Sequence, residues 1–430
     1  MGSKRGRVDK GTFKQILRDH WEEFKGAYPR YNTLYYDRVI RKMLECGDPE
    51  KAGYAVYLCA HCGEMRKVAF SCKSSFCLSC AKVYTDEWAS FVGRRLFPAV
   101  AYRHVVLTVP EELRVWFYRN PNLLSPLMKA GHECLVETVS LVKRERLELG
   151  SIVVLQTAGR SGGYNPHLHI LLTSGGLNAG GEWVGYGYLH YEILHKKWQY
   201  YLLSMLRQEV KDPKIKEDID RCWKKYKKGL VAWIEKGKVP EGGKGLAEYL
   251  ARYVVSPPIS VRRIEEYDGE RITYWYNDHK TGARKRETVG ALKFIGRMVQ
   301  HILPKGFQRI RYYGLHASCK YEQVRAHLEE ILPGKSVNQP DTYRVVPRER
   351  FQERFFSAFG EDPIKCGRCG ERMELWKIWA PGYGVIFDRW KEIFREDINV
   401  RGDDRVGTRY ARFGQDTEVQ LSMSFMPVSV

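Results

Sequence analysis

The sequence predicts an α+β protein that also carries small zinc-binding modules. Three observations lead to this class: helical apolar spacing in several segments, short apolar runs typical of strands, and repeated Cys-x-x-Cys pairs. With 430 residues, of which 43% are hydrophobic, the chain can form two or three domains that each have a core. We expect an N-terminal helical and zinc-ribbon domain at 1–96, a central domain at 97–333 and a C-terminal module at 334–430.

The first elements are helices followed by a cysteine-rich segment. Residues 12–25 and 34–46 have helical apolar spacing, and Gly47 stands where a helix is expected to end. A Cys-x-x-Cys knuckle at Cys59 and Cys62 is followed, fourteen residues later, by another at Cys77 and Cys80. This spacing is typical of a zinc ribbon in which four thiolates hold one Zn²⁺ in a tetrahedron. Cys72 lies between the knuckles and is an alternative ligand.

The central segment alternates strands and helices. Apolar runs predict strands at 102–110, 151–157 and 167–173, the last two forming a hairpin, and paired strands around a turn at 278–282. Helical spacing is found at 85–96, 125–149, 191–238 and 290–302. A glycine-rich break at 242–245 precedes a helix that ends before Pro257 and Pro258.

The C-terminal module contains half of a second ribbon. Cys366 and Cys369 form a third Cys-x-x-Cys pair, whereas random placement of eleven cysteines predicts about a quarter of one such pair in the whole chain. No second half is close in sequence. The missing zinc ligands come from a distant segment, or the two cysteines are simply reduced thiols.

Two histidines are candidate ligands of a catalytic metal. His167 and His169 are two residues apart at the start of an apolar run, so in a strand both imidazoles point to one face. Buried imidazoles need a partner, which is a metal ion or a hydrogen-bonding group of the core. A third ligand is expected from the preceding strand. If the two strands pair about their turn, Gln156 lies across from His169, and a slip of one residue places Thr157 there.

Two tyrosines are candidate nucleophiles. Tyr249 and Tyr253 are four residues apart on an expected helix, so their phenols lie one turn above each other. Such a pair arises by chance about once or twice in a chain with 27 tyrosines, and one of the two could simply pack on its helix. A metal ion together with phenolic nucleophiles could cut DNA and hold the cut end.

The charge predicts a polyanionic partner. The chain has 71 Lys and Arg against 51 Asp and Glu, a net charge of +20, which favours nucleic acid over a merely soluble basic surface. Two basic runs interleaved with aromatic residues suit single-stranded DNA, and a solvated surface is the alternative for either run. They comprise Lys224, Lys225, Lys227, Lys228 and Arg284, Lys285, Arg286. No membrane span, secretory signal or nucleotide-binding Gly-x4-Gly-Lys loop is present, so we expect a cytoplasmic protein without a nucleotide cofactor.

The order of these motifs resembles a known family. A five-cysteine ribbon precedes the block at 102–110, then Asn165-Pro-His-Leu-His, Tyr-x3-Tyr and the block from Leu303 to Gly314. This order is similar to the two-tyrosine HUH transposases of the bacterial insertion sequence ninety-one family over roughly residues 15–330. Asn165 departs from the family pattern, where a histidine or similar residue is expected, but the histidine pair is intact.

The resemblance implies a rolling-circle transposase with a central antiparallel sheet flanked by helices. It implies that His167 and His169 bind catalytic Mg²⁺ or Mn²⁺, and that Tyr249 and Tyr253 form 5′-phosphotyrosine links to single-stranded transposon and target DNA at the bacterial nucleoid. A rolling-circle replication initiator has the same catalytic parts, although the ribbon-bearing N-terminus and the Leu303–Gly314 block favour a transposase. A zinc-ribbon DNA-binding regulator without catalysis is the alternative from another class.

Overall fold

A computed structural model of the chain describes residues 11–72, 74, 76–80, 92–234, 258–278, 281–332 and 362–393. The chain forms two compact units. The large unit comprises Met1–Asp37 and Tyr84–Val346, and the small unit comprises Arg38–Val83 and Pro347–Val430. This division differs from three consecutive domains, because segments from both ends of the sequence meet in the small unit.

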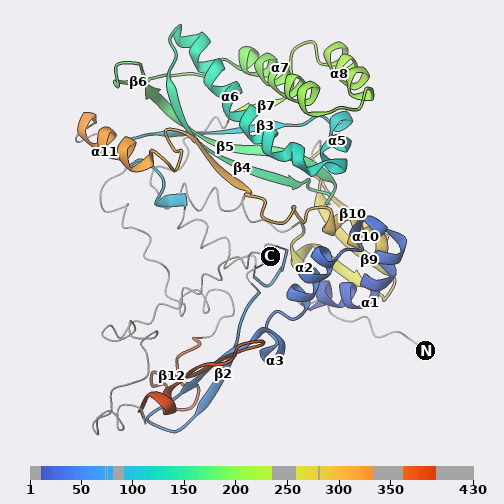
Figure 1. Cartoon of the computed structure of the whole chain (residues 1–430). Helices are drawn as coiled ribbons and strands as arrows, with labels where there is room; N and C mark the ends of the chain where they lie inside the picture. Colours follow the sequence, from blue (N-terminus) through green and yellow to red (C-terminus); the bar gives the residue numbers. More distant parts are fainter. Residues whose placement is uncertain are drawn as a thin grey trace. The chain divides into compact units, whose positions relative to one another are not determined.

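An antiparallel sheet forms the centre of the large unit, as expected (Figure 1). Among the described residues it has six strands in the order β11-β4-β5-β3-β7, with β6 paired to β5. The strands are β3 (Tyr102–Thr108), β4 (Glu148–Ala158), β5 (Tyr164–Leu177), β6 (Trp183–Gly185), β7 (Ala232–Ile234) and β11 (Ile310–Gly314). The hairpin of β4 and β5 confirms the expected pairing of the second and third strands of the central segment.

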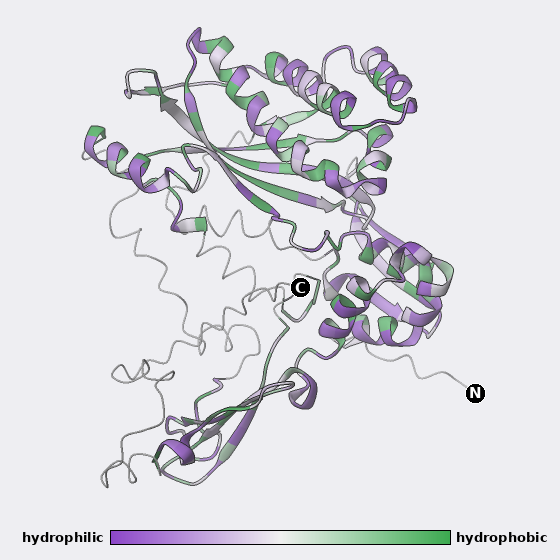
Figure 2. Cartoon of the chain, viewed as in Figure 1, coloured by the Kyte–Doolittle hydropathy of each residue, from purple (hydrophilic) through white to green (hydrophobic). Residues whose placement is uncertain are grey.

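Helices cover one face of this sheet (Figures 1 and 2). They are α5 (Arg114–Arg119), α6 (Leu124–Lys143), α7 (Tyr191–Glu209) and α8 (Lys214–Lys225), and their buried apolar residues form one core with alternate residues of β3, β4 and β5. On the other face, α11 (Tyr321–Ile331) packs through Leu328 against a smaller cluster that includes Val154 and Leu171. Both faces of the sheet therefore have apolar cores.

Two expected helices are shorter than their apolar spacing predicts. The helix expected at 125–149 ends at Lys143, because Arg144 adopts the left-handed conformation with φ 57° and the chain then enters β4. The helix expected at 191–238 is divided at Pro213 into α7 and α8 and is followed by strand β7. The described part of the helix expected at 85–96 begins at Val92.

A second sheet in the large unit joins β8 (Ile264–Tyr267), β9 (Arg271–Asn277) and β10 (Arg284–Gly290). It confirms the paired strands expected around the turn at 278–282. Helices α1 (Thr12–Ala27) and α10 (Ala291–Val299) pack together beside it, with the Phe13 and Phe294 ring centroids 6.3 Å apart. Short 3-10 turns lie at Pro29–Tyr31, Glu111–Leu113, Pro121–Leu123 and Val261–Arg263.

The small unit contains a four-stranded antiparallel sheet in the order β13-β12-β1-β2. Strands β1 (Tyr54–Leu58) and β2 (Met65–Ala69) come from the N-terminal part, and β12 (Glu374–Ala380) and β13 (Gly384–Asp388) come from the C-terminal part. Helices α2 (Leu34–Leu44) and α3 (Pro49–Ala52) precede β1. Because β1 pairs with both β2 and β12, the sheet requires both ends of the sequence.

None of the helices described is long and apolar enough to cross a membrane.

Gly314 lies at a close approach of two strands and gives a test of the sheet. It has φ +58°, and a Cβ atom there would lie 1.8 Å from the Leu149 carbonyl oxygen. Gly306 has φ +74° but open space around its Cβ position. We expect Gly314→Ala to lower the free energy of unfolding by about 3 kcal/mol or more, and Gly306→Ala by about 1 kcal/mol, because only the first adds a clash to the conformational cost. Urea denaturation measures both, and equal losses would contradict the β4–β11 pairing.

Candidate functional site

The histidine pair lies in β5, between β4 and β3. His167 is directly opposite Gln156 on β4 and Thr108 on β3, and His169 is opposite Val154 and Val106. Alternation along the strand places both imidazoles on one face of the sheet, as the sequence predicts. Their ring centroids are 5.0 Å apart.

The His167 imidazole is oriented by its own strand. Its Nδ1 lies 2.7 Å from the Asn165 carbonyl oxygen. Since a carbonyl oxygen can only accept a hydrogen bond, Nδ1 carries the proton and a metal would be bound through Nε2. Burial lowers the pKa of His167, and the nearby Arg114 guanidinium lowers it further against a raising contribution from the Asn165 carbonyl. The imidazole is therefore neutral near pH 7, which is the form that binds metals.

The His169 imidazole is oriented by a neighbouring histidine. His104 Nε2 and His169 Nδ1 are 3.0 Å apart, so one donates a hydrogen bond to the other, and the rings are stacked with their planes 6° apart. Burial lowers the pKa of His169 well below its ordinary value, and His167 and His104 lower it further. Since Nδ1 of His169 is engaged by His104, a metal at this residue would be bound through Nε2.

His104 was not identified from the sequence as a site residue. It lies in β3, within the block at 102–110, for which only a strand and a family motif were predicted. One sequence feature could have identified it: a histidine inside an apolar strand is buried, and a buried imidazole needs a specific partner. The register of β3 against β5 places that partner at His169, and this pairing becomes visible only in the fold.

Gln156 lies on the histidine face, although its partner differs from the expected one. We expected Gln156 opposite His169; the strands instead place it opposite His167 and place Val154 opposite His169. A shift of two residues leaves the face unchanged. The one-residue slip that would bring Thr157 opposite His169 does not occur, because Val154 holds that position. The Thr157 hydroxyl instead lies 3.1 Å from Nδ1 of the buried His301. The connection between β4 and β5 is therefore two residues shorter than the expected pairing assumes.

The first basic run lies beside the histidine end of β3. Lys224, Lys227 and Lys228 are exposed at the end of α8 and in the loop that follows, and Lys225 forms an ion pair with Glu112. The loop ends at Val231, whose carbonyl oxygen accepts a hydrogen bond from the Thr108 hydroxyl at 3.0 Å. Because Thr108 is opposite His167, the loop that follows this run ends at the same end of the sheet as the histidine pair, whereas α8 itself packs on the opposite face.

The second basic run, on β10, is partly neutralised. Arg284 and Arg286 both contact Glu265, at 2.8 and 2.9 Å, and Lys285 contacts Asp278 at 2.5 Å. The Arg284 guanidinium also lies 4.0 Å from the centre of the Trp275 ring. These cations are less available to phosphates than their sequence suggests.

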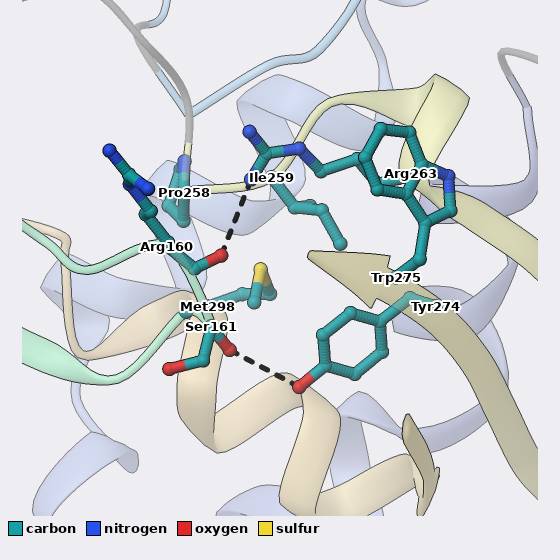
Figure 3. Close-up of a pocket in the computed structure, with 9 residues that line it drawn as sticks. Arg160, Ser161, Pro258, Ile259, Arg263, Tyr274, Trp275 and Met298 are labelled. Atoms are coloured by element: carbon teal, nitrogen blue, oxygen red, sulfur yellow. Dashed lines mark hydrogen bonds between the residues drawn. The ribbon is translucent and has the colours of Figure 1, made fainter. Parts of the chain in front are cut away.

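Tyr249 and Tyr253 lie outside the described residues, but both flanks of their segment are described. Before it, Ile234 in β7 pairs with Val105, the neighbour of His104. After it, Pro258 and Ile259 line a small hollow beside the β4–β5 turn, together with Arg160 (Figure 3). Two hydrogen bonds hold the walls of this hollow together. The Arg263 guanidinium donates to the Arg160 carbonyl oxygen, and the Tyr274 hydroxyl donates to the Ser161 carbonyl oxygen. The flank before the segment is thus paired with β3, which carries His104, and the flank after it lies beside the β4–β5 turn.

Eight of the eleven cysteines form two groups of four, which corrects the expected ligand set. Cys59 and Cys62 lie with Cys366 and Cys369, whereas Cys77 and Cys80 lie with Cys46 and Cys72, and within each group all sulfur atoms are within 4.8 Å of one another. The expected ribbon of Cys59, Cys62, Cys77 and Cys80 is therefore not assembled. Pairing of β1 with β12 instead brings Cys366 and Cys369 to Cys59 and Cys62. Cys72, Cys366 and Cys369 are candidate ligands as proposed, and Cys46 was missed because it was assigned only to the end of a helix.

The chain is similar to known transposases over most of its length. Residues 16–109 match a family model described as a transposase zinc-binding domain, and residues 150–323 match one described as a putative transposase. The chain is 31% identical over 349 residues to the transposase for insertion sequence element IS801 of Pseudomonas savastanoi pv. phaseolicola, covering 78% of this chain and 82% of that protein. It is 27% identical over 372 residues to the putative transposase y4qJ of Sinorhizobium fredii (strain NBRC 101917 / NGR234), covering 82% and 92%. No solved structure shows a significant match.

Proposed function

Because the chain belongs to the IS91 (insertion sequence ninety-one) family of transposases, we propose that it nicks and rejoins single-stranded DNA at element ends by a rolling-circle route. The observation that carries this proposal is the arrangement of His167 and His169. Both are neutral, both have Nδ1 engaged, and both lie on one sheet face with Gln156. Imidazoles held in this way are suited to bind a metal ion rather than to fill a core.

We assign His167, His169 and Gln156 as the residues that would hold catalytic Mg²⁺ or Mn²⁺. Two nitrogen ligands favour Mn²⁺ over Mg²⁺, while the amide oxygen suits either ion. When bound, the ion would supply Lewis-acid polarisation of the scissile phosphate. His104 would not contact the ion itself. Its hydrogen bond to His169 fixes the orientation of that ligand's ring.

Tyr249 and Tyr253 are the proposed nucleophiles. The phenolic oxygen attacks phosphorus, the bond from phosphorus to the 3′ oxygen breaks, and the phenolic proton is lost as the 3′ oxygen gains one. The products are a 5′-phosphotyrosine and a free 3′-hydroxyl. The ester conserves the energy of the broken bond, so rejoining needs no nucleotide cofactor. Support comes from the flanks of the tyrosine segment: the one before it is paired with β3, and the one after it lines a hollow beside the β4–β5 turn.

The DNA strand would follow the basic run at the edge of the sheet. Lys224, Lys227 and Lys228 are exposed there, and the exposed Trp223 offers a ring on which a base could stack. The β10 run has Trp275 beside Arg284 but keeps its cations paired with acids. We therefore assign the larger part of the phosphate contacts to the Lys224–Lys228 run.

A covalent-adduct assay tests the proposed function. The full chain is incubated with a labelled single strand carrying the element end and Mn²⁺, and the products are separated on a denaturing gel. We expect a protein-linked band that carries label on the 3′ side of the nick, together with a free 3′-hydroxyl fragment, and no band in EDTA. Cleavage without a protein-linked product would contradict the tyrosine mechanism, and binding without cleavage would favour the non-catalytic regulator.

The replication initiator is distinguished by a second substrate. A donor that carries both element ends and an unrelated recipient replicon are supplied together. A transposase joins the element to the recipient, whereas an initiator nicks and recloses only its own origin. If the donor is reclosed into a circle and no product joins the element to the recipient, the result would favour the initiator.

A further inference from the structure

We propose that the small unit holds two separate Zn²⁺ ions, and that the second, bound by Cys59, Cys62, Cys366 and Cys369, joins the C-terminal module to the turn of the β1–β2 hairpin. The first would be bound by Cys46, Cys72, Cys77 and Cys80. The matched zinc-binding family model ends at residue 109, so it contains the first group and only half of the second. This inference does not depend on the proposed DNA chemistry.

The two halves of the second group have the same local structure. Both read Cys-x-x-Cys-Gly-Glu, at residues 59–64 and 366–371. In each, the first cysteine donates its backbone N–H to the glutamate carbonyl oxygen, at 2.9 Å for Cys59 and 2.8 Å for Cys366. In each, the glycine has positive φ, 74° for Gly63 and 82° for Gly370. Two equivalent knuckles facing each other are what a four-thiolate zinc ribbon requires.

The sulfur separations fit a tetrahedral ion. With Zn–S bonds of about 2.3 Å, the edge of a ZnS4 tetrahedron is about 3.8 Å. The Cys59 and Cys369 sulfurs are 3.4 Å apart, and those of Cys62 and Cys366 are 3.5 Å apart. A disulfide would need about 2.05 Å. The thiols are therefore unbonded and spaced for a shared metal ion, and four thiolates favour Zn²⁺ over hard cations.

The first group passes the same test. Sulfur atoms of Cys46 and Cys72 lie 3.4 and 3.6 Å from that of Cys80. The Cys72 backbone N–H also donates to the Cys46 sulfur at 3.2 Å. All four cysteines of this group are buried, as expected for a closed structural site rather than a catalytic one with an open position.

The β1–β2 hairpin separates the two groups. Cys59 and Cys62 lie in its turn, whereas Cys72 follows its open end, where Ala69 pairs with Tyr54. A strand of five residues is about 17 Å long, so the two ions would share no ligand and each could be removed without the other.

Metal content of the purified full-length protein tests the proposal. We expect two Zn²⁺ per chain by elemental analysis. Cys366→Ser with Cys369→Ser should retain one, as should Cys72→Ser with Cys77→Ser, while the exposed Cys319→Ser should retain two. One Zn²⁺ per wild-type chain would overturn the proposal, as would two in the Cys366/Cys369 variant.

A measurement on the unmodified chain covers the case in which a variant does not fold. Zn²⁺ is withdrawn in steps with a chelator, and alkylated cysteines are identified by mass spectrometry at each step. Cys59, Cys62, Cys366 and Cys369 should become reactive together, separately from the other four. Alkylation of Cys366 and Cys369 before any zinc is released would overturn the proposal.

Discussion

Replacing both tyrosines, as Tyr249→Phe with Tyr253→Phe, is expected to abolish the covalent adduct. Loss of a nucleophile costs about a million-fold in rate when the remaining groups act with it as a unit. Phenylalanine keeps the ring and removes only the hydroxyl, so packing is preserved while the attacking oxygen is lost. The measurement is the yield of protein-linked label on a denaturing gel.

The single variants and a control separate chemistry from folding. If the two phenols attack different ends, each single Phe variant should form an adduct with one DNA end and fail to complete joining. Tyr200→Phe is the control, because Tyr200 is exposed on α7, which packs on the opposite face of the sheet from the histidines. A protein-linked band that persists in the double variant would refute the assignment of these nucleophiles.

Removing the histidine pair has the second largest expected effect. Lewis-acid assistance contributes several kcal/mol, so His167→Ala with His169→Ala should slow cleavage by about a thousand-fold or more at any practical Mn²⁺ concentration. The double variant loses both nitrogen ligands, so Gln156 would be the one proposed metal ligand left on this face of the sheet. Initial rates of strand cleavage across a Mn²⁺ titration measure the effect.

His104→Ala should give a graded version of the same defect. His104 only orients His169, and loss of such a partner typically costs about 10- to 100-fold in metal affinity. Higher Mn²⁺ should therefore restore its rate, whereas it should not restore that of the double variant. His190→Ala, at an exposed position before α7, should match the wild type. Equal defects in His104→Ala and the double variant at saturating Mn²⁺ would contradict a positioning role.

The histidine face could be predicted from the sequence because it depends on local periodicity. A period of two fixes the face of His167 and His169 whatever the rest of the fold does. The partner of Gln156 depends on the length of the β4–β5 turn, which shifts the register by two residues from the expected one. The role of His104 depends on a neighbour 65 residues away in the sequence. The sheet face of the histidines was thus predictable from the sequence. The register of β4 against β5 and the long-range contact of His169 with His104 were not.

The zinc ligands show the same limit. Spacing identified the Cys-x-x-Cys pairs but could not tell which pairs share an ion, because that choice is made by strand pairing between β1 and β12. One sequence feature favoured the observed grouping: Gly-Glu follows the knuckles at Cys59 and Cys366 but not the one at Cys77. Matching the residues around each knuckle would have joined the first to the third.

The position of β1 between β2 and β12 determines the order in which the molecule can be completed during synthesis. All described strands of the central sheet have been synthesised once Gly314 is added to the chain. In contrast, β1 cannot pair with β12 until Glu374–Ala380 has been synthesised. Until then, β1 and β2 form a lone hairpin with an open edge, which is marginally stable and prone to pair with other chains. A polypeptide released early would therefore contain the complete histidine face but an unfinished cysteine-rich hairpin. Translation past Asp388 supplies the missing strands.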